Sequence, residues 1–185
     1  MNNEMIKISG IVKNSIVDGI GVRYVIFTQG CSHNCHGCHN PETHDFNGGY
    51  YMSVDDIMSD IDKYIIGIRG ITLSGGDPLY PLNRKAVTYL CKRFKEKYPY
   101  QTIWLYTGYT IEQLDLSENI FKYVDVLVDG PFIESLLDEK RVLLGSTNKN
   151  LTFITERYKD CADYFNNPVS IEEITAEDYI FINGD

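Results

Sequence analysis

Positive charge is scarce in this chain of 185 residues, because 17 Lys and Arg residues face 26 Asp and Glu residues and leave a formal net charge of −9. Such a balance does not suit a protein that follows a phosphate backbone, so we expect no nucleic acid partner. The chain also lacks an apolar run of the roughly 18 residues that a membrane span needs, and it does not begin with the basic and then apolar pattern of a signal peptide. We therefore expect a cytoplasmic protein with no membrane partner.

Cysteine is sparse outside one short segment. The chain has five cysteines, an odd number that argues against a disulfide framework in a cytoplasmic protein. Cys31, Cys35 and Cys38 are crowded together, whereas Cys91 and Cys161 stand alone, which favours a structural role for these two. The four histidines all lie in or just after the crowded segment, at His33, His36, His39 and His44.

No repeat or Pro- or Ser-rich linker divides the chain, and 43% of its residues are hydrophobic, enough for one domain with a buried core. We expect residues 1–185 to form that single domain, although the pattern after about residue 145 has no clear period. Segments rich in β-branched and aromatic residues predict strands at 22–27, 70–73, 102–106 and 124–128.

Helices are predicted between these strands. Ser53 can cap a helix that extends to about Ile66, and a second amphipathic helix runs from Leu82 to a stop before Pro99. Thr110 and Gln113 form a capping box that predicts a third helix.

The alternation of strands and helices indicates an α/β fold with a parallel sheet and crossover helices, either open or curled into a barrel. In such sheets the loops that follow the strands emerge at one edge, where α/β proteins place their sites. We therefore expect four loops that are distant in sequence to converge in space, at 31–38, 74–78, 107–110 and 129–132.

The crowded cysteines have the spacing C-x3-C-x2-C, which lets one loop wrap a single inorganic centre. Thiolates are the ligands that iron–sulfur clusters and zinc prefer. A 4Fe-4S cluster held by Cys31, Cys35 and Cys38 would have one iron without a protein ligand, and that iron could bind a small molecule. Two alternatives remain at this stage, a zinc site of three Cys and one nearby His, and a cluster closed by a distant fourth Cys.

A second candidate site is the glycine-rich run 74–78, Ser-Gly-Gly-Asp-Pro, which follows a predicted strand. Bare backbone and the carboxylate of Asp77 suit an ammonium group, whereas a phosphate site would normally add Lys or Arg and a helix N-terminus. An ordinary turn is the alternative when this run is considered without the cysteines.

Taken together, these motifs resemble the radical S-adenosyl-L-methionine (SAM) enzymes, and among them the activating enzymes that install glycyl radicals. The most similar group is the activating proteins of anaerobic (class III) ribonucleoside-triphosphate reductase. The resemblance covers about residues 5–150 and rests on 17–23 (VDGIGVR), 27–31 (FTQGC), 38–40 (CHN), 73–79 (LSGGDPL), 104–109 (WLYTGY), 126–130 (VLVDG) and 145–148 (GSTN). Gly37 departs from the many radical SAM enzymes that have an aromatic residue there, but it fits this group.

The resemblance implies a partial (β/α) barrel and a set of site residues. Cys31, Cys35 and Cys38 would bind the 4Fe-4S cluster, Gly75, Gly76 and Asp77 would hold the SAM ammonium, Gly37, Cys38 and His39 would line the cofactor, and Thr107 and Asp129 would border the pocket. No catalytic protein residue is implied, because the cofactors carry the chemistry.

The resemblance also implies a reaction and two partners. The reduced cluster would cleave SAM, and the resulting 5′-deoxyadenosyl radical would take hydrogen from a glycine of the reductase catalytic subunit. A flavodoxin or ferredoxin-type protein would supply the electron. The competing interpretations are a pyruvate formate-lyase-type activating enzyme, a radical SAM enzyme with a small-molecule substrate and, from another class, a zinc-binding interaction module.

Overall fold

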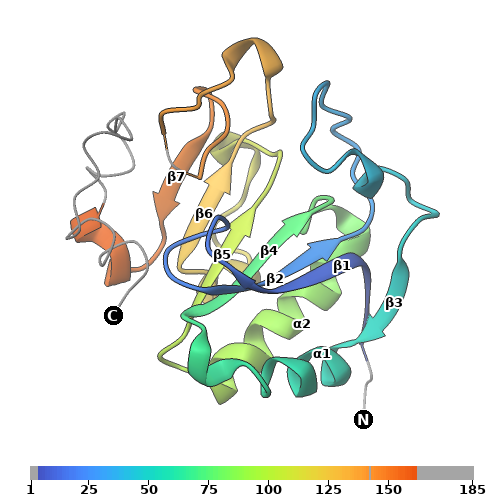
Figure 1. Ribbon diagram of the computed structural model, residues 1–185, viewed down its shortest axis with the longest axis vertical. Helices are drawn as coiled ribbons and strands as arrows, with labels where there is room; N and C mark the ends of the chain where they lie inside the picture. Colours follow the sequence, from blue (N-terminus) through green and yellow to red (C-terminus); the bar gives the residue numbers. More distant parts are fainter. Residues whose placement is uncertain (1–3, 142, 162–185) are drawn as a thin grey trace.

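The computed structural model describes residues 4–141 and 143–161, and within these residues one open sheet contains seven strands in the order β3-β1-β2-β4-β5-β6-β7 (Figure 1). The strands are β1 (Met5–Ser15), β2 (Arg23–Thr28), β3 (Tyr50–Ser53), β4 (Gly70–Gly75), β5 (Thr102–Tyr106), β6 (Val126–Asp129) and β7 (Asn150–Phe153). The α-helices are α1 (Val54–Ile61) and α2 (Pro81–Lys97). Short 3-10 segments lie at Pro41–Thr43, Ile65–Gly67, Ile111–Gln113, Asn119–Lys122, Glu134–Leu136 and Glu156–Cys161.

The centre of the sheet is parallel, and its edges are not. β2, β4, β5 and β6 pair in parallel, which confirms the α/β class and the four predicted strands. β1 and β3 on one side and β7 on the other are antiparallel, so the sheet is mixed and the predicted parallel strands form only its centre. The sheet stays open between β3 and β7. Residues 162–185, which the single-domain prediction includes, lie outside the described part of the chain.

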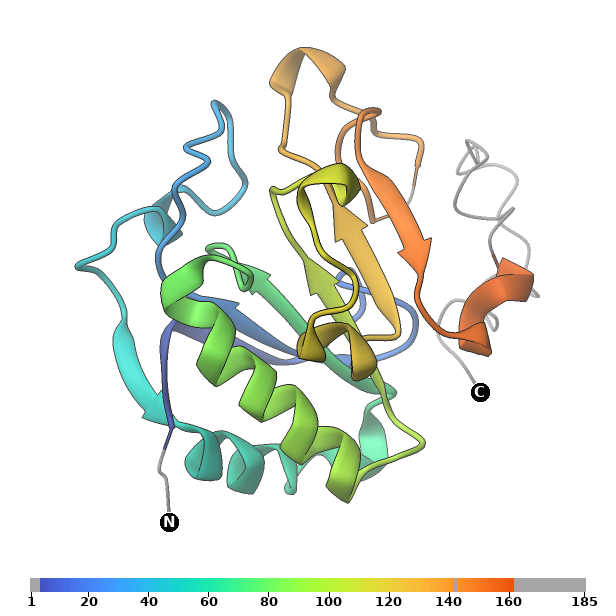
Figure 2. The same cartoon turned by 180° about the vertical axis from the view of Figure 1, so that it is seen from behind.

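The core has two parts because strand side chains alternate between the two faces of the sheet. On one face α2 lies across the strands with α1 beside it (Figure 2), and Leu73 and Leu105 pack there with Ile57 of α1 and Leu90 of α2. A smaller cluster around Trp104 covers the other face. Among the described residues, no helix is long and apolar enough to cross a membrane.

The predicted helices are correct in part. α1 begins as expected, because the Ser53 hydroxyl accepts a hydrogen bond from the Asp56 N–H at 3.0 Å, but it ends at Ile61, and Ile66 is fully exposed. The predicted helix after Thr110 is wrong. Its capping box forms, yet only one 3-10 turn follows, because Asp115 turns the chain by accepting a hydrogen bond from the Ser117 N–H.

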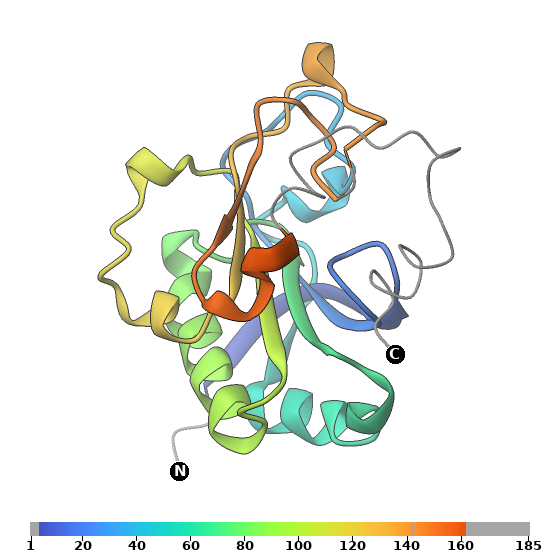
Figure 3. The same cartoon turned by 90° about the vertical axis from the view of Figure 1, so that its left-hand side faces the viewer.

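The loop that joins β1 to β2, residues 16–22, stands on the side of the sheet opposite α2 (Figure 3). A fully buried arginine anchors it. Arg23 donates hydrogen bonds to the hydroxyls of Thr72 at 3.1 Å and Thr102 at 2.7 Å, and the Thr72 hydroxyl donates to the carbonyl of Asp18 at 2.7 Å. Burial lowers the pKa of Arg23 to about 10. This chain of bonds fixes Asp18 beside the site described next.

Candidate functional site

The three crowded cysteines lie on a loop, residues 30–40, that we call the cysteine loop. β2 leads into it, and its base is tied down where the Gly30 N–H donates to the Thr43 carbonyl at 2.8 Å. Three residues have the positive φ that the sharp turns of the loop need, Gly30 with φ of 97°, Asn34 with φ of 48° and Gly37 with φ of 69°. The loop thereby brings all three thiols to the wall of one cavity.

The chemistry of these thiols suits soft-metal ligands. Cys31, Cys35 and Cys38 are free and partly buried. Burial raises the pKa of the Cys31 thiol. The Asn40 N–H donates a hydrogen bond to Cys38 Sγ at 3.4 Å, a contact of the kind that tunes a ligating sulfur. Cys91 is completely buried in α2, where burial raises the pKa of its thiol to about 12, in agreement with a packing role. The side chain of Cys161 lies outside the described part of the structure.

β4 ends in the second motif, residues 74–78, which we call the glycine loop. The Gly76 N–H donates to the Thr28 carbonyl at 2.7 Å, so the loop lies directly on the end of β2. A Cβ atom at Gly76 would come within 2.7 Å of the Gly30 carbonyl oxygen, and Gly75 has a φ of +87°. Both positions therefore need glycine, because the glycine loop and the start of the cysteine loop touch through their backbones.

Asp77 is the polar centre of the site. Its carboxylate is 1% exposed and accepts hydrogen bonds from the backbone N–H groups of Leu79 at 2.8 Å and Gly108 at 3.0 Å, and from the Thr107 hydroxyl at 2.9 Å. His33, from the cysteine loop, contacts it at 2.6 Å between Nε2 and Oδ2. Four groups of the chain thus contact the carboxylate. Asp77 therefore affects ligand binding mainly by fixing the conformation of the glycine loop.

The four loops converge as expected. A cavity of about 580 Å³, within the usual size of ligand pockets, lies at the C-terminal ends of the parallel strands. Its lining includes Cys31, Cys35, Cys38, His39, Ser74, Gly75, Gly76, Asp77, Thr107, Gly108, Gly130 and Phe132. Gly37 and Asp129 are not part of this lining. A Cβ atom at Gly37 would meet the Glu134 carboxylate, and the Asp129 carboxylate accepts from the Ile111 N–H at 3.0 Å.

Two further lining residues, Lys149 and Tyr106, are not among the site residues that the sequence motifs single out. Lys149 lies there with Cys35 and Cys38, and no carboxylate in the described part of the chain forms an ion pair with it. Burial lowers the pKa of Lys149, against the opposing effect of the two cysteines. The buried Tyr106 hydroxyl has no hydrogen-bond partner among the described residues. Sequence spacing gives no signal for either residue, because both reach the site through the pairing of distant strands.

The donor set fits an iron–sulfur cluster with a small polar ligand beside it. Three free thiols supply soft ligands from one loop, while the glycine loop, the Lys149 ammonium and the unpartnered Tyr106 hydroxyl line the same hollow.

Comparisons with known proteins agree with this donor set. A family model described as a 4Fe-4S single cluster domain matches residues 17–152, so the expectation of an iron–sulfur cluster is supported and the zinc alternative is not. The chain is also similar to the crystal structure of QueE from Escherichia coli, with a TM-score of 0.46 and 16% identity over 57% of this chain and 53% of that one.

Several curated relatives have the name anaerobic ribonucleoside-triphosphate reductase-activating protein. The relative from Vibrio cholerae is 42% identical over 138 residues, which is 72% of this chain and 89% of the relative. Those from Enterobacteria phage T4 and Escherichia coli K12 are 41% and 37% identical, covering 73% and 72% of this chain and 86% and 90% of the relatives. This chain belongs to the family of anaerobic ribonucleoside-triphosphate reductase-activating proteins.

Proposed function

We propose that this protein activates an anaerobic ribonucleoside-triphosphate reductase by using a 4Fe-4S cluster and SAM to form a glycyl radical on the reductase catalytic subunit. One observation carries the proposal: in a member of this family, three free thiols and the glycine loop line a single cavity at the C-terminal edge of the parallel strands. The sheet is open in the structure, so the partial barrel that the resemblance implies is not confirmed.

Cys31, Cys35 and Cys38 hold three irons in this proposal, and the fourth iron is left for the amino and carboxylate groups of SAM. When bound, the reduced cluster would supply the electron for cleavage of the S–C5′ bond of SAM, the chemistry that removes a hydrogen atom from the reductase glycine. The residues of this chain position the cofactors and exclude water. Gly75 and Gly76 present backbone to the SAM ammonium, while Asp77 fixes their loop.

The remaining lining residues give the ligand its surroundings. His39 contacts Phe132 with ring centroids 4.8 Å apart, and the two rings form an aromatic part of the wall. Lys149 places a positive charge on the wall that it shares with Cys35 and Cys38, where it complements thiolates and the SAM carboxylate. A flavodoxin or ferredoxin-type protein delivers the electron. Thiolate ligands require reduced cysteines, a condition that the cytoplasm meets, so we propose a cytoplasmic location. We also propose that residues 1–185 form a single domain.

The test is to reconstitute the cluster anaerobically, reduce it, and add SAM and the reductase while recording EPR spectra. We expect a glycyl radical on the reductase with the wild-type protein and with Cys91→Ala, because Cys91 lies in the core of α2 away from the cavity lining. Cys35→Ala should bind less iron and give no radical.

Other outcomes would assign a different function. SAM cleavage without a radical on the reductase, but with one on pyruvate formate-lyase, would favour the other activating class. A protein that binds zinc, takes up no iron and does not cleave SAM would overturn the enzyme assignment altogether.

A further inference from the structure

His33 lies within the cysteine loop, between Cys31 and Cys35, and lines the same cavity, but its imidazole contacts the glycine loop. The His33 side chain is 17% exposed, and its Nε2 atom lies 2.6 Å from Oδ2 of Asp77. A carboxylate that receives four donors can only accept, so Nε2 carries the hydrogen in this contact. The bond joins two loops that are separated by 44 positions in the sequence.

The rest of the His33 ring is held as closely as its nitrogen. It packs edge-on against Tyr109, with ring centroids 4.7 Å apart. A Cβ atom at Gly108 would come within 2.4 Å of the His33 ring, so the ring rests directly on the backbone that follows β5. His33 therefore contacts both the loop after β4 and the loop after β5.

Asp77 also joins the loop after β4 to the loop after β5. Its carboxylate accepts the Leu79 and Gly108 N–H groups and the Thr107 hydroxyl. Thus the loops that follow β2, β4 and β5 are joined at one buried carboxylate, and His33 is the side chain by which the cysteine loop reaches it. A backbone hydrogen bond from the Asp77 N–H to the Gly30 carbonyl at 3.1 Å joins the same two loops at their base.

We propose that His33 is a positioning residue that couples the cysteine loop to the glycine loop, so that a loaded cysteine loop fixes the glycine loop in the conformation that binds SAM. This inference rests on the proposed function. A buried hydrogen bond to a charged group restricts both loops, and a ligand that binds an already ordered loop loses less conformational freedom. Removing the bond is expected to weaken SAM binding while the three cysteine ligands remain in place.

The experiment compares His33→Leu, His33→Gln and His36→Asn with the wild-type protein, all purified anaerobically with their cluster. His36 is the matched control, because it lies on the same loop but its side chain is 91% exposed and pairs with Glu134 at the surface. Iron content and the dissociation constant for SAM are measured without reductant, so that no turnover occurs. We expect about tenfold weaker SAM binding in His33→Leu with unchanged iron content, and wild-type binding in His36→Asn.

His33→Gln separates positioning from packing. The glutamine amide can still donate to Asp77, so this variant should recover most of the SAM affinity, whereas an effect of ring packing would weaken both variants equally. Equal weakening, or SAM binding by His33→Leu within twofold of the wild type, would overturn the inference.

Amide hydrogen exchange on the purified proteins tests the coupling without SAM. The Leu79 and Gly108 N–H groups donate to Asp77, so they should exchange about tenfold faster in His33→Leu than in wild type or His36→Asn. Unchanged exchange would refute the coupling. A wild-type protein that binds neither iron nor SAM would instead refute the proposed function, and the exchange rates would still decide whether His33 connects the loops.

Discussion

Lys149 places a positive charge on the wall of the cavity, which Cys35 and Cys38 also line. A cluster gains negative charge when it is reduced, so a nearby positive charge stabilises the reduced form. Lys149→Met is therefore expected to make the reduction potential of the cluster more negative, by about 59 mV for a tenfold change in a one-electron equilibrium. A redox titration followed by EPR measures this shift.

The matched control for this prediction is Lys122→Met. Lys122 is exposed and donates to Asn119 in the 3-10 segment before β6, and it does not line the cavity. Its replacement should leave the potential unchanged. The charge argument fails if the two variants have the same potential.

Site residues from one loop can be predicted from the sequence, whereas those that meet through tertiary pairing cannot. Cys31, Cys35 and Cys38, the proposed cluster ligands, come from one loop, so their spacing alone marks them as candidates. The partner of Asp77 is 44 positions away, and only the parallel pairing of β2 with β4 brings His33 to it. Contacts that depend on tertiary pairing leave no local pattern to detect.

At the scale of elements, the start of β4 depends on one glycine. Gly70 has a φ of +153°, and a Cβ atom there would lie 1.9 Å from the carbonyl oxygen of Thr102 in β5. Because the clash is with backbone, Gly70→Ala should force the two parallel strands apart and reduce the free energy of unfolding by about 3 kcal/mol or more. Urea denaturation measures the loss.

Gly67→Ala is the control for this prediction. No atom lies within 4 Å of a Cβ built at Gly67, and its backbone is not left-handed. The free energy of unfolding should change by no more than about 0.5 kcal/mol. Similar losses in the two variants would contradict the close approach of β4 and β5 at Gly70 as the cause.

Asp60 connects α1 to the antiparallel side of the sheet. Burial favours its neutral form, but hydrogen bonds from Tyr24, Lys63 and Lys13 hold the pKa of Asp60 at about 2, below the usual 3.8. A lowered pKa in the folded state stabilises the fold above about pH 4, and that contribution is lost as the pH falls toward 2. Asp60→Asn should therefore be less stable at pH 7 and should lose less stability between pH 4 and pH 2. Parallel stability profiles for the two proteins would contradict this account.

The elements also show where sequence patterns are informative. The central strands β2, β4, β5 and β6 are mostly buried on both faces, because helices or loops cover them, and their short, largely apolar runs are easily recognised. The outer strands β1 and β7 carry polar residues and Gly10 or Asn150, so their strand signal is weak. Capping signals at Ser53 and Thr110 mark where a helical turn starts but not how long it continues.

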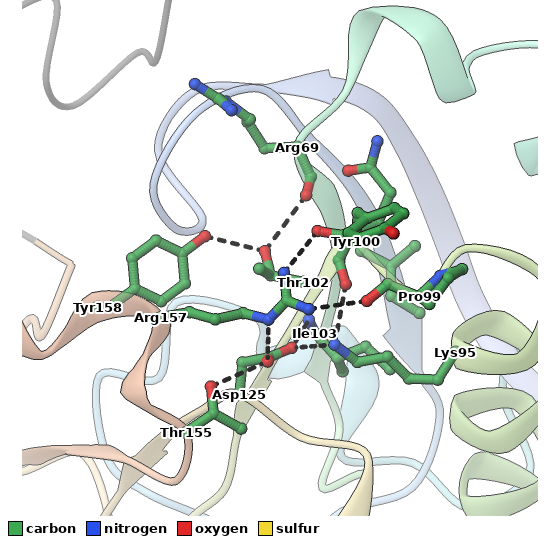
Figure 4. Close-up of polar contacts among 12 residues, drawn as sticks. Arg69, Lys95, Pro99, Tyr100, Thr102, Ile103, Asp125, Thr155, Arg157 and Tyr158 are labelled. Carbon is green, nitrogen blue, oxygen red and sulfur yellow. Dashed lines mark hydrogen bonds and ion pairs between the residues drawn. The ribbon is translucent and has the colours of Figure 1, made fainter.

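In the molecule as a whole, the two ends of the parallel strands differ in what they carry. The C-terminal edge carries the cavity, where bare backbone and free thiols meet. The opposite edge carries a network of ion pairs and hydrogen bonds around Asp125, which directly precedes β6 (Figure 4). The Asp125 carboxylate is 1% exposed and accepts from Lys95 of α2 at 2.6 Å, the Ile103 N–H of β5 at 2.8 Å and the Thr155 hydroxyl at 3.0 Å.

Arg157, which follows β7, connects this network to the segment that precedes β5. Its guanidinium lies 3.4 Å from the Asp125 carboxylate and donates to the carbonyls of Pro99 and Tyr100, each at 2.8 Å. Asp125 thus holds α2, β5 and the segment after β7 together, on the edge of the sheet away from the cysteines (Figure 4).

Asp125→Asn should separate stability from cofactor binding. Removing the charge leaves Lys95 without its buried partner, which typically costs about 3–5 kcal/mol in the free energy of unfolding. Asp62→Asn is the control, because the Lys97–Asp62 pair is 51% and 40% exposed and such surface pairs contribute about 0–1 kcal/mol.

Urea denaturation and iron content are measured on the same samples. Because the cysteine loop is held by β2 and the glycine loop, Asp125→Asn protein that is still folded should bind the wild-type amount of iron. Loss of iron in step with loss of stability would mean that the two edges of the sheet are one cooperative unit and that the site depends on the whole sheet.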